Sequence, residues 1–402
     1  MRAYERLLKY AAINTQSDEN SGSVPSTECQ RELAELLADE MRRMGMERVR
    51  VDEHAYTCGF ISPTPGREQE PVIGLIAHLD TAPDFSGEKV RPRLIVDYDG
   101  GDVSLGESGR ILKTADFPAL KAMEGQALIV TDGTSLLGAD DKAGIAEILT
   151  ACEIILTDRL PHGGIAVCFV PDEEIGHGAE LLDIESFGAK FAYTVDGDAV
   201  NEINCETFNA ASAVFDIKGV NVHPGSAKGI MVNASLLAME INALLPEEEI
   251  PAETEGYEGF YHLTEMSGSV EHAVLKYIVR DHDGEKFRQR CDKLREIEKA
   301  VNRRYAGEYV SLSLHPQYRN MKEVISENPE IVERAEKAIR KAGLTPKLVP
   351  VRGGTDGAQL SFRGLPCPNL GTGGEGFHGP YEHITAEAMD NAVDIILNIV
   401  SC

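Results

Sequence analysis

Four short apolar runs, each continuous and not alternating, constrain the fold of this chain more than any other feature. They cover residues 72–77, 128–130, 165–170 and 191–195. A strand is apolar at every position when both faces of its sheet are covered, as in a parallel sheet with helices on either side. Helical patterns lie between and before these runs, at 142–156, at 178–183, and from the capping sequence Ser26-Thr27-Glu28 to residue 44. The chain is therefore predicted to be an α/β protein with a mostly parallel sheet covered by helices.

The pattern changes near residue 210 to one that predicts a separate α+β unit. The expected order is strand 212–218, helix 231–245, strands 260–266 and 269–280, helix 285–305 and strand 309–314. A βαββαβ order is typical of ferredoxin-like units. Helical and apolar patterns of the first kind resume at residue 321. We therefore expect a discontinuous domain, 1–208 with 321–402, that carries an inserted ferredoxin-like lid domain at 209–320.

Charge excludes two classes of partner. The chain has 39 basic and 66 acidic residues and a net charge of -27, which would repel nucleic acids and anionic membrane surfaces. No apolar run approaches the roughly 20 residues of a spanning helix. The first residues read as an amphipathic helix, not as a signal peptide, and the eight cysteines contain no CxxC pair, which favours reduced thiols. We expect a cytoplasmic protein that binds neither nucleic acid nor membrane.

Residues of the kinds that bind metals follow the predicted strands. His78 and Asp80 follow the first strand, Asp140 and Asp141 precede a helix, and further acids follow two other strands, namely Glu173, Glu174 and Asp196. Each group alone has a structural explanation: a histidine bonded in place, a helix N-cap, a solvated loop. Ligand sites of open α/β sheets lie at the carboxyl ends of the strands. Carboxylates gathered there repel one another and need a cation, so the sequence predicts a metal site.

The same stretches resemble a known family. HLD, GADDKAG, PDEEIG and TVDGD, in that order, are similar to the motifs of the dinuclear zinc peptidases of the M20 type. PSTE at 25–28, NVHPGSAKG, TEGYEGFYH and RGGTDGAQLSF resemble the tripeptide aminopeptidases of that family along nearly the whole chain. The resemblance implies a zinc-binding α/β domain with an inserted lid. It also implies removal of the N-terminal residue from small peptide substrates, tripeptides.

By this resemblance the chain binds two Zn²⁺ ions, for which Co²⁺ or Mn²⁺ can substitute. The implied ligands are His78 and Asp196 at one ion, Glu174 and His378 at the other, and Asp140 bridging both. Mixed histidine and carboxylate ligation suits Zn²⁺. The three carboxylates and a bridging hydroxide would balance the charge of two divalent ions.

Two catalytic residues are implied next to the ligands. Glu173 corresponds to the general base that takes the proton of the metal-bridging water. Asp80 is expected to hold the second ring nitrogen of His78 and so fix its tautomer. The resemblance also implies a cis peptide bond between Asp140 and Asp141.

Three residues outside the metal motifs are expected to bind the substrate. His223, in NVHPG, is expected to donate to the oxyanion, although the residue alone reads as a loop histidine. Arg280 is expected to bind the terminal carboxylate of the peptide, with pairing to Asp281 or Asp283 as the alternative. Arg352, in VRGGTDG, is a second cation expected near the site.

The segment around His378 departs from the family pattern. TGGEGFHG keeps the ligand context, but PYEHIT differs from the usual KHEFVT, and Glu375 replaces a commonly aromatic residue. His383 is therefore a rival ligand to His378.

Two other functions stay open. An M20-type amidohydrolase or deacylase acting on N-acyl amino acids, or a carboxypeptidase, would share the metals and the base. A metal-binding scaffold without turnover would not need Glu173 or His223. A homodimer through the lid domain is a further expectation.

Overall fold

The structure is a computed structural model that describes residues 1–401, with the side chain of residue 107 excepted. The chain divides into two compact units. The first comprises Met1–Cys205, Met321–Val349 and Thr355–Cys402, and the second comprises Glu206–Asn320 and Pro350–Gly354. The predicted insertion at 209–320 lies inside the second unit, whose last short segment the sequence did not indicate.

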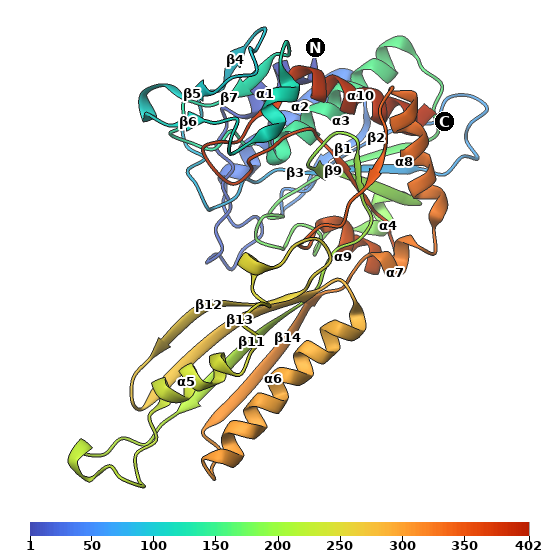
Figure 1. The fold of residues 1–402 in the computed structure, drawn as a ribbon. Coiled ribbons are helices and arrows are strands. Elements are labelled where there is room, and N and C mark those ends of the chain that lie inside the picture. The colour runs from blue at the N-terminus through green and yellow to red at the C-terminus, as the bar shows by residue number, and fades with distance from the viewer. Residues whose placement is uncertain (402) are drawn as a thin grey trace. The chain divides into compact units, whose positions relative to one another are not determined.

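The first unit is built on an eight-stranded sheet (Figure 1). In spatial order its strands are β1 (Glu47–Val51), β2 (Thr57–Ile61), β8 (Ile165–Val170), β3 (Ile73–His78), β9 (Phe191–Gly197), β16 (Asn369–Gly371), β10 (Glu202–Asn204) and β15 (Lys347–Leu348). Its helices are α1 (Ala3–Tyr10), α2 (Cys29–Met44), α3 (Ala139–Asp158), α4 (Ile184–Phe187), α7 (Lys322–Ile325), α8 (Pro329–Lys341), α9 (Asp356–Phe362) and α10 (Ala386–Ser401). The α/β class predicted from the sequence is confirmed.

The sheet contains more antiparallel strand pairs than the apolar runs predicted. Strands β8, β3, β9 and β16 pair in parallel at its centre, and so do β10 and β15. The pairs β1–β2, β2–β8 and β16–β10 are antiparallel. The parallel centre places the carboxyl ends of β8, β3 and β9 side by side, which matters for the site described below.

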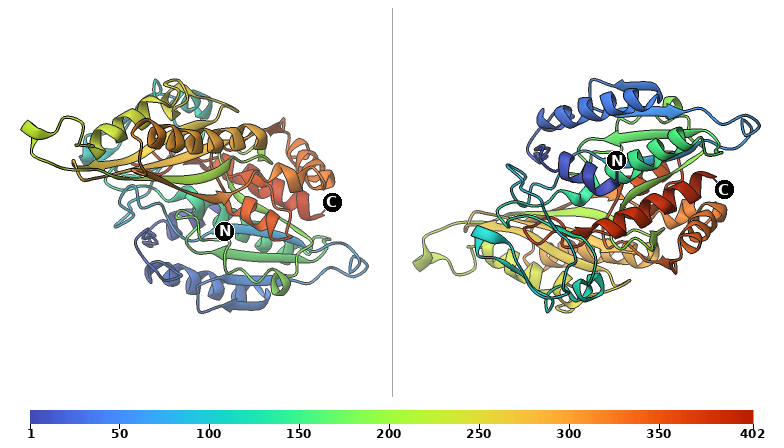
Figure 2. Two further views of the ribbon diagram at one scale, coloured as in Figure 1. Left: turned by 90° about the horizontal axis from the view of Figure 1, so that it is seen from below. Right: turned by 90° about the horizontal axis from the view of Figure 1, so that it is seen from above.

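Both faces of the sheet are covered, as the continuous apolar strands require. Alternate residues of β8 point to opposite faces. One set, Ile165, Val167 and Phe169, packs in a core with α1, α2, α3, α8 and α10. The other set, Ala166, Cys168 and Val170, packs with α4 and α9. Figure 2 shows α10, in red, beside α3, against which it packs.

Two predicted elements of the first unit are wrong in detail. The run 128–130 forms β7 (Leu128–Val130), but β7 pairs with β4 (Arg93–Ile95) and β17 (Ile384–Thr385) in a separate three-stranded sheet. The long segment before β7 also contains β5 (Val103–Ser104), β6 (Ile111–Leu112) and two short 3-10 helices, Gly106–Ser108 and Pro118–Met123. Residues 178–183, expected to be helical, form turns at 178–181 and then loop, and the helix begins only at Ile184.

The second unit has its elements in the predicted order. They are β11 (Asn209–Lys218), α5 (Ala234–Ala243), β12 (Phe260–Gly268), β13 (His272–Asp281), α6 (Gly284–Arg304) and β14 (Val310–Tyr318), with short 3-10 helices at Pro224–Ser226 and Pro251–Glu253. The four strands form an antiparallel sheet in the order β12-β13-β11-β14. Alternate residues of β11 and β13 pack against α5 and α6 in a core of its own.

Within residues 1–401, no helix combines the length and the apolar character that crossing a membrane requires. The described cysteines are free thiols. Cys402, also expected to be a thiol, lies outside the described residues.

Candidate metal centre

The predicted metal ligands of the first unit come together at the carboxyl ends of adjacent strands. His78 is the last residue of β3, Asp196 lies near the end of β9, and Glu174 follows β8 in a loop. These three strands are neighbours in the sheet. Asp140 reaches the same place from the start of α3, and His378 from the loop after β16.

Asp140 lies between the two histidines. Its Oδ1 is 2.8 Å from His78 Nε2, and its Oδ2 is 3.3 Å from His378 Nε2. His78 Nε2 is also 3.4 Å from Asp196 Oδ1, and His378 Nε2 is 3.0 Å from Glu174 Oε2. Each imidazole thus faces Asp140 and one further carboxylate, an arrangement suited to two cations that share one ligand.

The backbone around Asp140 explains why its side chain leaves the helix. Asp140 and Asp141 have non-helical backbone angles, and the peptide bond between them is cis. The carboxylate of buried Glu382 accepts hydrogen bonds from the amides of Leu137, Gly138 and Asp140, at 2.7, 2.7 and 3.0 Å. The sequence did not identify Glu382, because nothing local distinguishes it from a surface glutamate.

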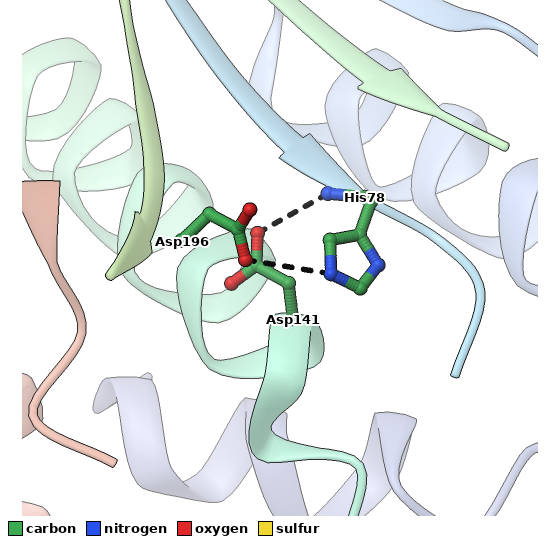
Figure 3. Close-up of side chains that lie close together, drawn as sticks. All are labelled: His78, Asp141 and Asp196. Atoms are coloured by element: carbon green, nitrogen blue, oxygen red, sulfur yellow. Dashed lines mark hydrogen bonds and ion pairs between the residues drawn. The ribbon is translucent and has the colours of Figure 1, made fainter. Parts of the chain in front are cut away.

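Asp141 forms a second group of potential metal ligands with His78 and Asp196 (Figure 3). It is fully buried, and its two oxygens accept from backbone amides, Oδ2 from His78 and Oδ1 from Gly144, both at 3.1 Å. A Cβ atom at Gly144 would lie 2.0 Å from the carbonyl oxygen of Val195. Glycine therefore allows α3 to approach β9 closely next to Asp196.

Asp80 lies next to His78, as predicted, but its main-chain oxygen is closer to the ring nitrogen than its carboxylate is. The ring nitrogen His78 Nδ1 is 3.0 Å from the main-chain oxygen of Asp80, whereas its carboxylate Oδ1 lies 3.5 Å away. A donor at Nδ1 leaves Nε2 free to bind a cation. The carboxylate of Asp80 instead accepts from the amides of Glu173 and Glu174, at 3.0 and 3.2 Å. Asp80 thus links the strand that carries His78 to the loop that carries both glutamates.

The electrostatics of the cluster fit bound cations. Burial raises the pKa of Glu174 to about 7, with Asp140 adding to the effect. Burial also raises the pKa of Asp196 to about 6 although His78 opposes it. Hydrogen bonds to Asp140 and Glu174 raise the pKa of His378 to about 11. Glu174 Oε1 is buried and has no hydrogen-bond partner among the described residues. Carboxylates that are costly to ionise together, and a buried oxygen of Glu174 with no hydrogen-bond partner among the described residues, suit the binding of divalent cations.

These shifts predict how pH changes the stability of the metal-free protein. A carboxyl group with a raised pKa stabilises the fold fully below its ordinary value, and this stability is lost as pH rises through the folded-state value. For Asp196 and Glu174 the loss ends at about 6 and about 7. We expect chelator-treated protein to unfold at lower urea concentration at about pH 8 than at about pH 5. Adding Zn²⁺ at the higher pH should reverse the loss, and equal midpoints at both pH values would contradict the prediction.

Glu173 lies beside the ligands without joining the carboxylate and histidine contacts. Burial, and after it Asp196 and Asp356, raise the pKa of Glu173 well above its usual range. Asp356 itself is buried, and burial raises its pKa to about 8. A half-buried acid with a raised pKa beside the cluster is a group that can exchange a proton at the site.

The remaining predicted residues lie in the second unit. Arg280 does not pair with the two neighbouring acids, because Asp281 binds Arg290 at 2.8 Å and Asp283 caps α6. Its guanidinium lies over the ring of Tyr318, and Nη1 is 3.4 Å from the main-chain oxygen of Arg352. Arg280 Nε is buried and has no hydrogen-bond partner among the described residues.

The other two residues of this group lie in loops. Arg352 stacks on the rings of Phe208 and Phe260 and donates to the main-chain oxygens of Gly256 and Glu258, at 2.8 and 2.9 Å. His223 is exposed, and its Nδ1 accepts from the amide of Gly225 at 3.1 Å.

His383, the rival ligand, lies apart from the cluster. It is fully buried, its Nδ1 is 2.8 Å from the main-chain oxygen of Tyr381, and its ring packs edge-on against Phe117. His378 is the histidine of this segment that contacts Asp140 and Glu174.

Comparison with known proteins gives the family. A model described as peptidase family M20/M25/M40 matches residues 135–401. Peptidase T of Clostridium perfringens (strain 13 / Type A) is 49% identical over 400 residues, which cover 99% of this chain and 98% of that protein. This chain belongs to peptidase family M20. Peptidase T of Geobacillus kaustophilus, another relative, is 50% identical over 98% of this chain and 97% of its own length.

Solved structures share the M20 fold of this chain. Aminopeptidase PepT from Bacillus cereus superposes with a TM-score of 0.79 at 23% identity, over 100% of this chain and 97% of that one. A dinuclear metal-binding M20 peptidase from Bacillus subtilis superposes with a TM-score of 0.65 at 15% identity, over 99% and 97%. Their likeness extends over both units of the M20 chain.

Proposed function

We propose that this chain is a metal-dependent aminopeptidase that removes the N-terminal residue from tripeptides. The observation that carries the proposal is the convergence of two histidines and two further carboxylates around Asp140, with the half-buried Glu173 beside them. The full-length similarity to proteins named Peptidase T supports the same activity.

The first unit supplies the residues for two cations. Our assignment places His78 and Asp196 at one ion, Glu174 and His378 at the other, and Asp140 between them, because its two oxygens face different histidines. We assign Zn²⁺, with Co²⁺ or Mn²⁺ able to substitute, from the mixed imidazole and carboxylate donors. When bound, two such ions polarise the scissile carbonyl group and lower the pKa of water.

Glu173 moves the proton in this proposal. Its carboxylate takes a proton from the attacking water and later gives it to the amino group that leaves. The amides of Glu173 and Glu174 bind Asp80, so Asp80 holds the base and its neighbouring ligand in a fixed relation. Glutamate at 173 performs both transfers without itself binding a cation.

The second unit supplies groups for the rest of the substrate. We assign Arg280 to the free carboxylate of the peptide, since its buried Nε has no hydrogen-bond partner among the described residues and a guanidinium fork binds a carboxylate with two hydrogen bonds. Arg352 supports Arg280 through its main-chain oxygen. The exposed His223 is assigned as the donor to the oxyanion. A homodimer through the second unit and a cytoplasmic location stay predictions.

The test of the substrate class compares peptides of different length with free and amidated ends. Tripeptides with both ends free should have the highest kcat/KM. Amidating the carboxylate, or replacing Arg280 with Ala, should lower kcat/KM for tripeptides by about 10- to 100-fold, because a charge-assisted hydrogen-bonded pair is lost. The matched control is Lys276→Ala, which removes an exposed cation from β13, the strand of Arg280, where Lys276 pairs with Glu265 of β12; it should change little.

Other outcomes would favour the alternatives. Release of the C-terminal residue would identify a carboxypeptidase, and preference for N-acyl amino acids would identify a deacylase. Equal cleavage of free and amidated tripeptides would refute the role of Arg280 while leaving the metal site in place.

A further inference from the structure

The loop that carries Glu173 and Glu174 is held by side chains, not by neighbouring strands. The amide of Asp172 donates to Gln30 Oε1 at 3.3 Å, and the amides of Glu173 and Glu174 donate to Asp80. Three consecutive amides are thus bonded to side chains that lie far away in the sequence. The position of Glu173 depends on how firmly those side chains are themselves held.

The side chain of Asp172 is itself held by three short hydrogen bonds. Its carboxylate accepts from the amide of Ser26 at 2.7 Å, from the hydroxyl of Ser26 at 2.6 Å and from Gln30 Nε2 at 2.6 Å. Asp172 and Gln30 are fully buried, and Ser26 is 8% exposed. Short hydrogen bonds to a buried carboxylate are among the strong polar interactions of a protein.

The backbone of Asp172 shows why this attachment is needed. Its φ is +58°, in the left-handed region that residues other than glycine rarely adopt. Such a conformation costs free energy and persists only where the surrounding structure fixes it. The turn it creates directs the next residue, Glu173, away from the line of β8, and Ser26 and Gln30 provide the bonds that hold the turn.

We propose that Ser26, Gln30 and Asp172 act as positioning residues for the general base. Gln30 lies on α2 and Ser26 just before it, so the start of this helix fixes the turn at Asp172. The turn at Asp172 then fixes the position of the Glu173 carboxylate. The inference rests on the proposed function for its effect on turnover, and it assigns a role to the PSTE segment, which otherwise has none in the reaction.

The test uses Ser26→Ala and Gln30→Met, which remove donors to Asp172 and leave every metal ligand and Glu173 in place. We expect kcat on a tripeptide to fall by about 10- to 100-fold, since small displacements of a catalytic group have effects of that size. KM and the number of bound metal ions per chain should stay unchanged. Ser26→Thr keeps the hydroxyl and should restore most of kcat.

The matched control is Tyr10→Phe. It also removes one hydroxyl that donates to a buried carboxylate, because Tyr10 binds Glu40 at 2.8 Å. Glu40 lies on α2, the helix that carries Gln30. This variant should lower Tm to a similar extent as Ser26→Ala with kcat unchanged. A merely structural role for Ser26 predicts that the two variants behave alike, and that result would overturn the proposal.

A second measurement does not depend on activity. In metal-free protein, hydrogen exchange at the amides of residues 172–174 should be at least about fivefold faster in Ser26→Ala than in Tyr10→Phe. Exchange unchanged from the control would overturn the proposal. If the wild-type protein cleaves no peptide, the proposed function fails, and faster exchange in Ser26→Ala would still support the fixed turn.

Discussion

Replacing Glu173 with Gln should lower kcat by about 10²- to 10⁴-fold, the contribution expected of a general base. Glutamine has the same shape and keeps the main-chain amide that binds Asp80, but it cannot accept the proton. The ligands His78, Asp140, Glu174, Asp196 and His378 are untouched. Two metal ions per chain should therefore remain bound, with KM little changed. The measurements are steady-state kinetics on a tripeptide and metal analysis of the purified variant.

Glu180→Gln is the control for this replacement. Glu180 lies on the same loop, is about half exposed and pairs only with His177 among the described residues, so its loss should not affect turnover. Loss of bound metal in Glu173→Gln would identify Glu173 as a ligand. An unchanged kcat would place the general base elsewhere in the cluster.

Removing the divalent cations should abolish turnover, and Zn²⁺ or Co²⁺ should restore it. The carboxylates of Asp140, Glu174 and Asp196 lie within one cluster with two imidazoles, where divalent cations would both balance the carboxylates and activate water. Purified active protein should contain about two divalent ions per chain. Metal analysis during titration back to full activity measures this stoichiometry.

Asp140→Asn tests the shared ligand. Because each oxygen of Asp140 faces a different histidine, this single change should weaken binding of both ions and reduce turnover to the level of chelated protein. Asp216→Asn, at an exposed acid paired with His272 in the second unit, is the matched control. Full activity of chelated, metal-free protein would refute the proposed metal site.

The sequence predicted the elements that local patterns determine. Continuous apolar runs identified β3, β8 and β9 because burial on both faces leaves no polar position. Periodicity located α2 and α3, but the expected cap at Ser26-Thr27-Glu28 is wrong, because neither helix begins with a side-chain cap. The apolar run of β7 predicts its burial but not its sheet, since an apolar run does not indicate which strand is its partner. Residues 178–183 have a helical pattern but form turns and loop, because short apolar patterns do not separate helix from loop.

For the candidate site, the sequence identified residues by type and by position after strands, and the structure brings His78, Asp140, Glu174, Asp196 and His378 together. It missed residues that act through backbone amides. Glu382 binds three amides of the Asp140 loop, and Asp172 is bonded to Ser26 and Gln30. Such contacts join positions more than a hundred residues apart, and a lone acid gives no sign of them in a single sequence. The sequence hints at a role for Asp172 only in that this acid directly precedes Glu173 and Glu174.

The order of strands in the large sheet has a consequence for synthesis on the ribosome. Strand β16 lies between β9 and β10, although β9 and β10 are separated by only a few residues in the chain. All helices and strands of the second unit lie between residues 209 and 318, so they are translated before β16. Until residues 369–371 emerge, β9 and β10 each present an unpaired edge, which is a place for aggregation or for a chaperone to bind. His378 is translated later still, so a nascent chain has the complete set of proposed metal ligands only after β16 has been made.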